Sequence, residues 1–215
     1  MSPITLYTAD TPNGYKVMLY LAEAGLDYQR VDVDLGRGDQ HQPAFLALNP
    51  NGKIPVLVDH DAGLTVFESC AILEYLSHRT GHLLPATEAQ CLTQRQWLYF
   101  QAASLGPMLG QLWWFLHGTD RINAQALGRY RDEALRLYQV VETRLAVSPY
   151  LALPDYGIAD IAAFAWLRTW RELTLDLRPF PHATLASRNR SAPCGAPARK
   201  DRRNARLAMP RPARK

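Results

Sequence analysis

The residues best placed to do chemistry lie in four short motifs, at residues 11–14, 49–53, 54–55 and 68–69. Two of them, Thr11-Pro12-Asn13-Gly14 and Glu68-Ser69, each precede a segment with helical periodicity. A helix N-terminus carries N–H groups without intrahelical partners and the positive end of the helix dipole, and both attract a carboxylate. Glu68 could pair with an ammonium group at the same place, so Glu68 and Ser69 favour a ligand with an amino-acid head group. The simpler alternative is that Ser69 only caps the helix.

The first motif lies inside a predicted βαβ unit. The β-branched and aromatic residues 4–7 predict a strand, and the apolar periodicity of residues 15–24 predicts a helix. The alternation of residues 28–33 predicts a second strand, which completes a βαβ unit of ordinary size. The turn residues 11–14 therefore join a strand to a helix.

A β-hairpin and a further helix follow. Residues 56–58 and 65–67 predict the hairpin, and residues 70–79 predict the helix that Glu68-Ser69 opens. Ile54-Pro55 stands just before the hairpin. An ordinary trans turn is the commoner state of a lone X-Pro bond. The neighbouring motifs favour the cis form here, which would turn the backbone amide and carbonyl toward a ligand.

In this order, the motifs closely resemble those of the glutathione transferases. Thr11-Pro12-Asn13-Gly14 with Phe67-Glu68-Ser69 resembles the nu class of bacterial glutathione transferases and disulfide-bond oxidoreductases. The resemblance runs from about residue 4 to Pro181 and implies an α/β thioredoxin-like N-terminal domain plus an all-α C-terminal domain, the glutathione transferase fold. We assign residues 1–82 to the glutathione-binding domain, residues 88–182 to the helical domain and residues 183–215 to a basic tail.

The resemblance also implies which residues bind glutathione. Glu68 and Ser69 would hold the γ-glutamyl end, and the backbone around Ile54 would pair with the cysteinyl amide. Lys53 would lie near the glycyl carboxylate, and Gln40 would be another contact at the glycyl end.

One implied glutathione-binding residue lies in the helical half of the chain. Arg136, in Leu135-Arg136-Leu137-Tyr138, matches a family arginine that would reach the bound peptide from the helical domain or from a partner subunit. A solvated arginine on a helix surface is the alternative that the residues alone favour.

Several residues could activate the thiol. In nu-class proteins, the residues that match Asn13 and Thr11 lie near the sulfur, so the resemblance implies that they are catalytic. Lowering a thiol pKa from about 8.5 to near neutrality needs roughly 2 kcal/mol, and one hydrogen bond to a charged group supplies about 1.5–3 kcal/mol. One or two donors therefore suffice. The alternative is that both side chains only cap the strand end, and for Tyr7 and Cys70 packing is the simpler interpretation.

We therefore expect glutathione-dependent thiol transfer, which reduces small or mixed disulfides, opens hydroperoxides or conjugates glutathione to electrophiles. The alternative is a non-catalytic glutathione-binding protein on the same fold. The implied partners are glutathione as co-substrate, a small electrophile or disulfide, and a second copy in a homodimer. We expect neither nucleic acid nor a membrane as a partner.

Cysteine usage agrees with a cytoplasmic enzyme without a metal ion. The three cysteines, Cys70, Cys91 and Cys194, form neither a Cys-x-x-Cys motif nor a metal-binding spacing. No disulfide framework is expected, and the reactive thiol would come from glutathione.

The second half of the chain has helical periodicity over residues 88–116, 123–146 and 158–173. Pro107 should kink the first of these helices. Gly157-Ile158-Ala159-Asp160 matches a capping box in which glycine replaces the usual Ser or Thr. Trp113 and Trp114 would give an apolar pocket for the second substrate, unless they pack in the core or at an interface.

The last segment has a different composition. Residues 183–215 contain ten Lys and Arg and one Asp, a net charge of +9, which leaves −5 for residues 1–182. A segment rich in Ala, Arg and Pro without aromatic residues is predicted to be disordered. It departs from the family pattern after His182, and either a frameshift in the gene or a sequencing error would explain the departure.

Overall fold

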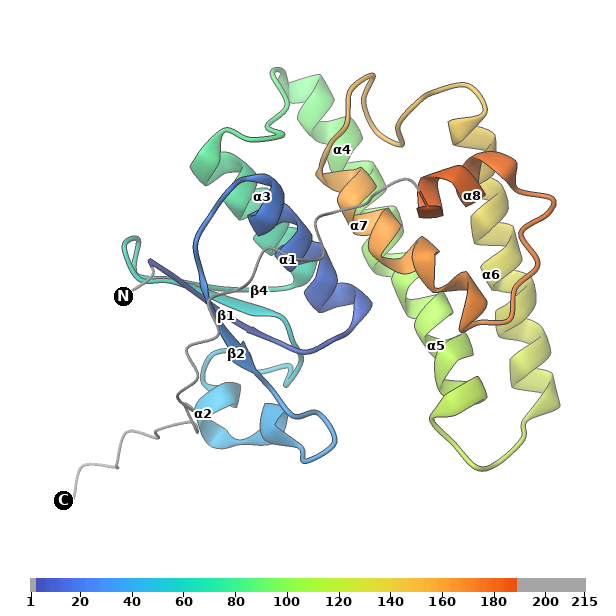
Figure 1. The fold of residues 1–215 in the computed structure, drawn as a ribbon, viewed down its shortest axis with the longest axis horizontal. Helices are drawn as coiled ribbons and strands as arrows, with labels where there is room; N and C mark the ends of the chain where they lie inside the picture. The colour runs from blue at the N-terminus through green and yellow to red at the C-terminus, as the bar shows by residue number, and fades with distance from the viewer. Residues whose placement is uncertain (1–2, 189–215) are drawn as a thin grey trace. The chain divides into compact units, whose positions relative to one another are not determined.

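The computed structural model describes residues 3–188, which form two compact units, residues 3–72 and 73–188 (Figure 1). The boundary between the units falls inside helix α3 (Ser69–Thr80). The units follow from internal packing alone, so the predicted domains 1–82 and 88–182 stay a prediction. Within the described residues, no helix has the length and apolar character that a membrane span needs.

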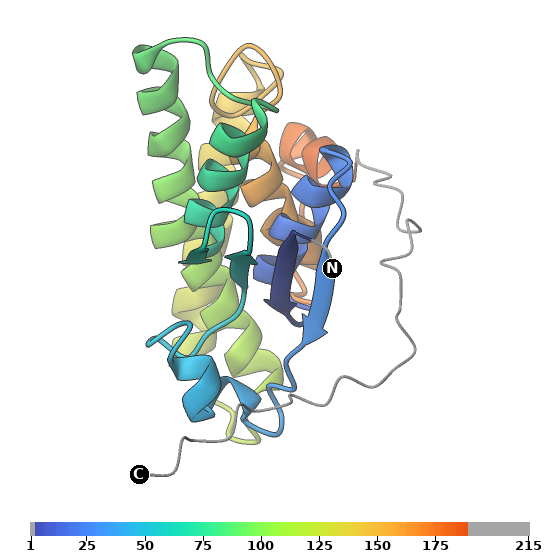
Figure 2. The same ribbon diagram turned by 90° about the vertical axis from the view of Figure 1, so that its left-hand side faces the viewer.

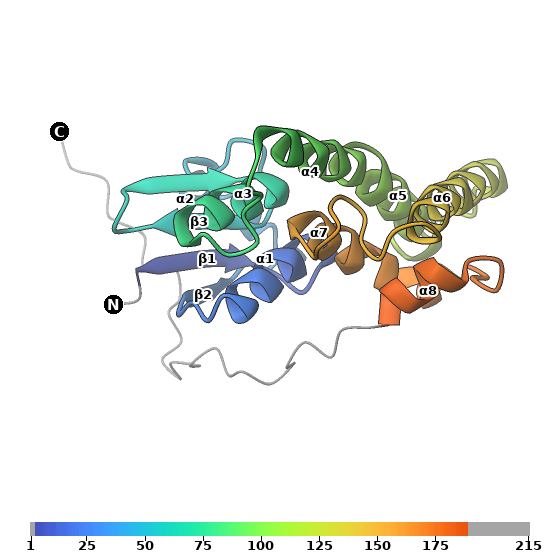
Figure 3. The ribbon, with the colours of Figure 1, turned by 90° about the horizontal axis from the view of Figure 1, so that it is seen from above.

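The first unit is built on a four-stranded mixed sheet with the strand order β2-β1-β3-β4 (Figure 3). Strand β1 (Ile4–Thr8) pairs in parallel with β2 (Gln29–Asp32) and antiparallel with β3 (Val56–Asp59). Strand β4 (Leu64–Phe67) pairs antiparallel with β3. The predicted strands and hairpin are confirmed, with the second strand shorter than expected.

Helices of the first unit connect and cover these strands. Helix α1 (Pro12–Glu23) follows β1, and its buried residues include Val17, Leu19, Tyr20 and Leu21. The link between β2 and β3 contains the 3₁₀ turn η1 (Asp39–His41) and the short helix α2 (Pro43–Leu46). The first turn of α3 lies beside α1 (Figure 1).

Gly14 is needed where α1 approaches the end of β1. A Cβ atom at this position would collide with the Thr8 hydroxyl and would lie 2.5 Å from the Ala9 carbonyl oxygen. Only glycine lets the first turn of α1 lie this close to the strand. The position of the α1 N-terminus therefore depends on this residue.

The second unit is helical and contains α4 (Glu88–Phe100), α5 (Gly106–His117), α6 (Ala124–Leu145) and α7 (Ile158–Leu167). Its buried core comes mainly from α5, α6, α7 and residues 173–183, and Trp97 and Phe100 of α4 pack against it. The 3₁₀ turn η3 (Arg168–Arg171) extends α7, and α8 (Pro181–Arg188) follows. Helix α7 is apolar on nearly all sides, because eight of its ten residues are buried.

The predicted helix over residues 88–116 is interrupted where a kink was expected. A π-helical turn, η2 (Gln101–Leu105), separates α4 from α5, and the N–H of Gly106 donates to the carbonyl oxygen of Gln101. Pro107 has no N–H to donate to the preceding turn, so a widened turn just before it replaces the regular ladder. Figure 2 shows the run of α4 and α5 in green.

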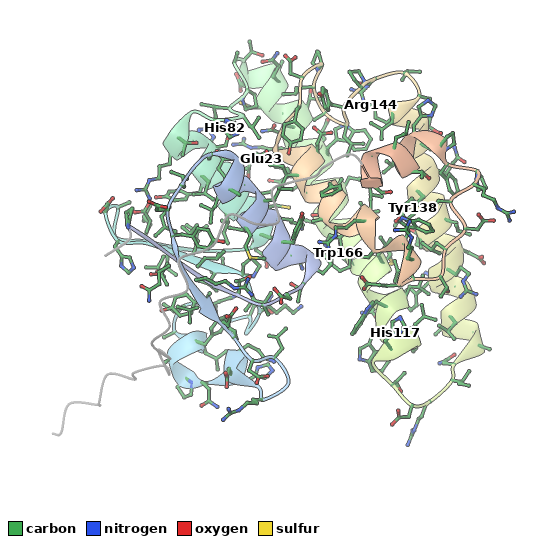
Figure 4. The ribbon with its side chains drawn as sticks, viewed as in Figure 1. Glu23, His82, His117, Tyr138, Arg144 and Trp166 are labelled. Atoms are coloured by element: carbon green, nitrogen blue, oxygen red, sulfur yellow. The ribbon has the colours of Figure 1, made fainter. Side chains whose placement is uncertain are left out.

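Trp166 of α7 packs against the glycine face of α5. A Cβ atom on Gly106 would lie 3.2 Å from the indole Nε1 of Trp166, and one on Gly110 would lie 3.2 Å from its ring. Tyr138 of α6 is fully buried, and its hydroxyl donates to the Leu167 carbonyl oxygen at 2.7 Å. Figure 4 labels Trp166 and Tyr138 among the side chains of this unit.

The predicted capping box at the start of α7 is confirmed. Asp160 Oδ2 accepts a hydrogen bond from the Gly157 N–H at 3.0 Å, and Oδ1 accepts one from the Leu151 N–H at 2.9 Å. Burial raises the pKa of Asp160 to about 6 despite these donors. Gly157 keeps the backbone geometry of the cap and supplies no side-chain bond.

The expectation of disorder from residue 183 onward is wrong for residues 183–188, which belong to α8. Glu142 of α6 stabilises the start of this helix. Its Oε2 accepts from the Ala183 N–H at 2.9 Å, and its Oε1 lies 2.6 Å from His182 Nδ1. Residues 189–215, with most of the predicted basic tail and Cys194, lie outside the described residues.

We expect Glu142→Gln to lower the free energy of unfolding by about 1–3 kcal/mol, because the new NH₂ group faces a donor. Burial alone would raise the pKa of Glu142, but the hydrogen bonds from Ala183 and His182 outweigh it and lower this pKa. The stabilisation is therefore present above the unfolded-state pKa of about 4.3 and is lost as the pH falls. Urea unfolding followed by circular dichroism at several pH values measures it.

Glu133→Gln is the matched control on the same helix. Glu133 pairs with Arg136 on the surface, so its loss should cost less than about 1 kcal/mol. Equal losses in the two variants would contradict the role given to Glu142.

We expect Gly14→Ala to destabilise the first unit by about 1–3 kcal/mol through overpacking against Thr8 and Ala9. Gly128→Ala is the control, because a Cβ atom at Gly128 meets nothing within 4 Å and this glycine lies inside α6. Alanine should stabilise that helix by up to about 1 kcal/mol. Thermal unfolding should move in opposite directions for the two variants, and a neutral Gly14→Ala would refute the packing argument.

Candidate functional site

The sheet register brings the predicted site residues of the first unit to one edge. Tyr7 of β1 lies opposite Val56 of β3, and Val56 lies opposite Phe67 of β4. The end of β1, the start of β3 and the end of β4 are therefore neighbours, and the parallel strand β2 also ends there. We call this the site edge: residues 9–16, 33–55 and 68–69, which leave or enter the sheet at this end and include the start of α1.

Thr11 and Asn13 lie where the chain leaves β1 and enters α1. Thr11 is the N-cap of α1, and its hydroxyl oxygen accepts from the Gly14 N–H at 3.2 Å. Asn13 is half-buried in the first turn. The capping interpretation holds for Thr11, and its hydroxyl hydrogen can still donate to a neighbouring group. The catalytic roles of both residues stay a prediction.

The loop before β3 is organised by Asn49. This side chain is buried, its amide nitrogen donates to the Lys53 carbonyl oxygen at 2.7 Å, and its oxygen accepts from the Asn51 N–H at 2.9 Å. The Ile54-Pro55 peptide bond is cis, as expected. Ile54 packs on the small cluster of Val33, Phe45 and Val56, which leaves Lys53 exposed.

Gln40 lies in the 3₁₀ turn η1 on the loop after β2. Its side-chain oxygen is buried, and it has no hydrogen-bond partner among the described residues. A buried acceptor without a donor is costly, so a ligand N–H or a water molecule would satisfy it.

Glu68 and Ser69 join β4 to α3 at the site edge. The expectation that Ser69 caps the helix is wrong by one position, because Ser69 is the first helical residue and the Glu68 carbonyl oxygen accepts the first bond, from the Ile72 N–H. Glu68 has a φ of 68°, in the left-handed region that non-glycine residues rarely adopt. Backbone strain of this kind is characteristic of ligand-binding loops. The Glu68 side chain is exposed, and Ser69 is buried beneath it.

A further charged residue lies beneath Ser69, and the sequence analysis did not identify it. Lys16 of α1 is 1% exposed, and its Nζ donates to Ser69 Oγ at 3.1 Å. Burial lowers the pKa of Lys16, while the nearby Cys70 and Glu68 oppose that shift. The signal was present in the sequence, because Lys16 shares the helix face of Leu19 and Tyr20, which are three and four residues later and are buried.

Tyr7 and Cys70 have the packing roles that the sequence favoured. The Tyr7 ring makes an edge contact with Phe45, with centroids 6.3 Å apart, and packs on the cluster around Val33. Cys70 is buried in the first turn of α3, and Cys91 is half-buried in α4. Within residues 3–188, no group of three or more His, Cys, Asp or Glu side chains could hold a metal ion.

Two predicted features belong to the second unit. Arg136 is exposed on α6, and its guanidinium makes two 2.7 Å hydrogen bonds to the carboxylate of Glu133. Its contact with glutathione stays a prediction. Trp113 and Trp114 of α5 are 43% and 47% exposed, so the interpretation that they pack in the core is wrong.

The site edge can bind a small zwitterion with more than one carboxylate. Helices α1 and α3 both begin there, so two sets of N–H groups and two positive dipole ends meet at this place. Lys16 and Lys53 add positive charge, and Glu68 supplies one exposed negative charge for an ammonium group.

Comparison with known proteins identifies the chain's relatives. Residues 2–78 match the family described as "Glutathione S-transferase, N-terminal domain", and residues 106–184 match "Glutathione S-transferase, C-terminal domain". The chain is 46% identical over 183 residues to the disulfide-bond oxidoreductase YfcG of Escherichia coli, over 83% of this chain and 85% of that protein.

Solved structures agree with this relationship. A glutathione transferase from Burkholderia graminis, with two glutathione molecules bound per subunit, has a TM-score of 0.81 and 37% identity over 86% of this chain and 82% of that one. A glutathione transferase from Pseudomonas putida, with one glutathione disulfide bound per subunit, has a TM-score of 0.79 and 37% identity over 87% and 84%. Since the two family matches cover most of the chain and both halves have the expected fold, this chain belongs to the glutathione S-transferase family.

Proposed function

We propose that this chain catalyses glutathione-dependent thiol transfer, and that its main reaction is the reduction of small or mixed disulfides. The observation that carries the proposal is the sheet register, which gathers Thr11, Asn13, the Ile54 backbone, Glu68 and Ser69 at the site edge. No single motif is distinctive. Together, however, the donors Thr11 and Asn13, the carboxylate of Glu68 and the N-termini of α1 and α3 suit a peptide with a thiol.

The charges of the site edge match the two ends of glutathione. The γ-glutamyl ammonium would pair with Glu68, and its carboxylate would bind Ser69 and the first turn of α3. The glycyl carboxylate would lie near Lys53, with Gln40 as a further contact at that end. Arg136 would be an additional contact from the helical unit or from a second subunit.

The reaction is a pair of thiol–disulfide exchanges. The glutathione thiolate attacks one sulfur of the substrate disulfide, forms a mixed disulfide and expels the other sulfur as a thiolate, which takes up a proton. A second glutathione thiolate attacks the glutathione sulfur of the mixed disulfide, which releases glutathione disulfide and the second substrate thiol. Two glutathione molecules are oxidised, and one disulfide is reduced to two thiols.

The relatives support this stoichiometry. The Burkholderia graminis protein holds two glutathione molecules per subunit, and the Pseudomonas putida protein holds one glutathione disulfide. A site that accommodates both states would suit a reaction that consumes two glutathiones and forms their disulfide. YfcG carries the name of a disulfide-bond oxidoreductase.

Asn13 and Thr11 are the proposed thiolate stabilisers. An Asn amide and a Thr hydroxyl are donors that cannot remove a proton at neutral pH, so they would lower the thiol pKa by hydrogen bonding alone. The first turn of α1 adds its N–H groups at the same place. The thiolate would therefore persist without a dedicated base.

We further propose that the protein acts in the cytoplasm as a homodimer and that small electrophiles are alternative substrates. A non-catalytic glutathione-binding protein is the competing proposal, and turnover separates the two. Glutathione binding without turnover of any disulfide or electrophile would favour that alternative.

Glutathione should raise the thermal stability of the protein. At a concentration of a hundred times its dissociation constant, a ligand that binds the native state adds about 2.7 kcal/mol to the free energy of unfolding. Differential scanning calorimetry measures the unfolding temperature with glutathione and, as the control, with γ-glutamyl-alanyl-glycine, which has no thiol. The comparison separates binding of the peptide from any effect of the thiol. A cooperative transition that neither peptide moves would refute the glutathione site.

Asn13→Ala should lower kcat/KM for disulfide reduction by roughly 10- to 100-fold, as expected for a lost hydrogen bond to a thiolate. Asn13→Asp is the matched variant. Aspartate in the first turn of α1 suits the helix dipole and should preserve stability, but its negative charge should lower turnover further than alanine does. Formation of glutathione disulfide, followed with glutathione reductase and NADPH, measures the rate. Unchanged turnover in both variants would exclude Asn13 from the reaction.

A further inference from the structure

Lys16 is a buried charged residue that the proposed chemistry does not yet use. Lysine is almost never fully buried unless it is paired, because its ammonium group loses solvation. Lys16 is 1% exposed and donates to Ser69 Oγ at 3.1 Å. The charges of Cys70 and Glu68 already act on this ammonium group, and its hydrogen bond leads to Ser69 at the site edge.

The direction of this hydrogen bond determines where the hydroxyl hydrogen of Ser69 points. An ammonium group has three donors and no acceptor, so Ser69 Oγ must be the acceptor. The hydroxyl hydrogen of Ser69 then points away from Lys16 and is available to donate to another group. Among residues 3–188, Lys16 is the hydrogen-bond partner of the Ser69 side chain. The Ser69 hydroxyl is thus oriented as a donor at the start of α3.

The position of Ser69 decides what it can donate to. Ser69 is the first residue of α3, so its hydroxyl lies beside N–H groups that have no partner within the helix. These groups and the positive end of the helix dipole select a carboxylate. Glu68, directly before it, has an exposed side chain that can take the ammonium group of the same amino-acid head.

We propose that Lys16 is a positioning residue of the site: it orients the Ser69 hydroxyl toward the α-carboxylate of the γ-glutamyl head and so sets the preference for ligands with that carboxylate. This inference rests on the proposed glutathione function. Lys16 acts through Ser69 and does not itself touch the reacting sulfur. Its loss should weaken binding of glutathione and leave the chemical step at saturation nearly unchanged.

The test combines variants of Lys16 with analogues of glutathione. Lys16→Met removes the charge and the donor at similar size, and Lys16→Arg keeps both. The analogue γ-aminobutyryl-cysteinyl-glycine lacks the α-carboxylate, and glutaryl-cysteinyl-glycine keeps a carboxylate but lacks the ammonium group. Dissociation constants from calorimetric titration, and KM and kcat for disulfide reduction, are measured for each pair.

We expect Lys16→Met to raise the dissociation constant and KM for glutathione by about tenfold or more, with kcat changed less than about twofold. The same variant should change the affinity for the analogue without the α-carboxylate by less than about twofold, because that analogue has lost the group that Ser69 binds. Lys16→Arg should restore most of the preference for glutathione. A loss of affinity that is equal for glutathione and for this analogue would show that Lys16 is merely structural and would overturn the proposal.

Ser69→Ala covers the case in which Lys16→Met does not fold. It removes the acceptor that Lys16 holds, and it should abolish the preference for the α-carboxylate to the same extent. An undiminished preference in Ser69→Ala would overturn the proposal by itself. If the wild type binds neither glutathione nor its analogues, the proposed function and this inference both fail. If the wild type binds and turns over glutathione while Lys16→Met or Ser69→Ala retains the preference, only the inference fails.

Discussion

The antiparallel pairing of β3 with both β1 and β4 is the constraint on which the candidate site depends. It places the end of β1, the start of β3 and the end of β4 side by side, so residues far apart in the chain meet at one edge. A slip of one residue would turn each side chain to the opposite face of the sheet. Ile4, Leu6, Val56 and Leu57 are all fully buried, so such a slip would disrupt apolar packing on both faces of the sheet. The apolar core of the sheet thus sets the geometry of a polar site.

The charges at the site edge lie at different depths. Glu68 is exposed, Ser69 lies below it, and Lys16 lies deeper in α1. The Lys16 ammonium group lies beneath the start of α3, and the Glu68 carboxylate is exposed beside it. A second negative group is therefore favoured at the start of α3. The left-handed backbone of Glu68 directs the chain from β4 into this arrangement. In the helical unit, the carboxylates of Glu142 and Asp160 each accept a backbone N–H at the start of a helix.

The sequence predicted the strands, most of the helices and the cluster of motifs at the site edge, because apolar alternation and turn residues act locally. It predicted less where tertiary contacts decide. Lys16 was not identified as a site residue, because its contact with Ser69 depends on the approach of α3 to α1. The sequence indicated a kink at Pro107 but not the π-helical turn before it, nor the packing of Trp166 against Gly106. Residues 183–188 have too little apolar periodicity to indicate a helix, and the carboxylate that stabilises it comes from Glu142, more than 40 positions earlier.

The distribution of aromatic residues has a consequence for spectroscopy. All five tryptophans, Trp97, Trp113, Trp114, Trp166 and Trp170, belong to the helical unit. Intrinsic tryptophan fluorescence therefore reports on that unit alone, whereas far-ultraviolet circular dichroism reports on both. The two signals coincide only when the units unfold in one cooperative step. The protein thus carries a built-in pair of probes that measures how strongly the thiol-binding unit and the helical unit are coupled.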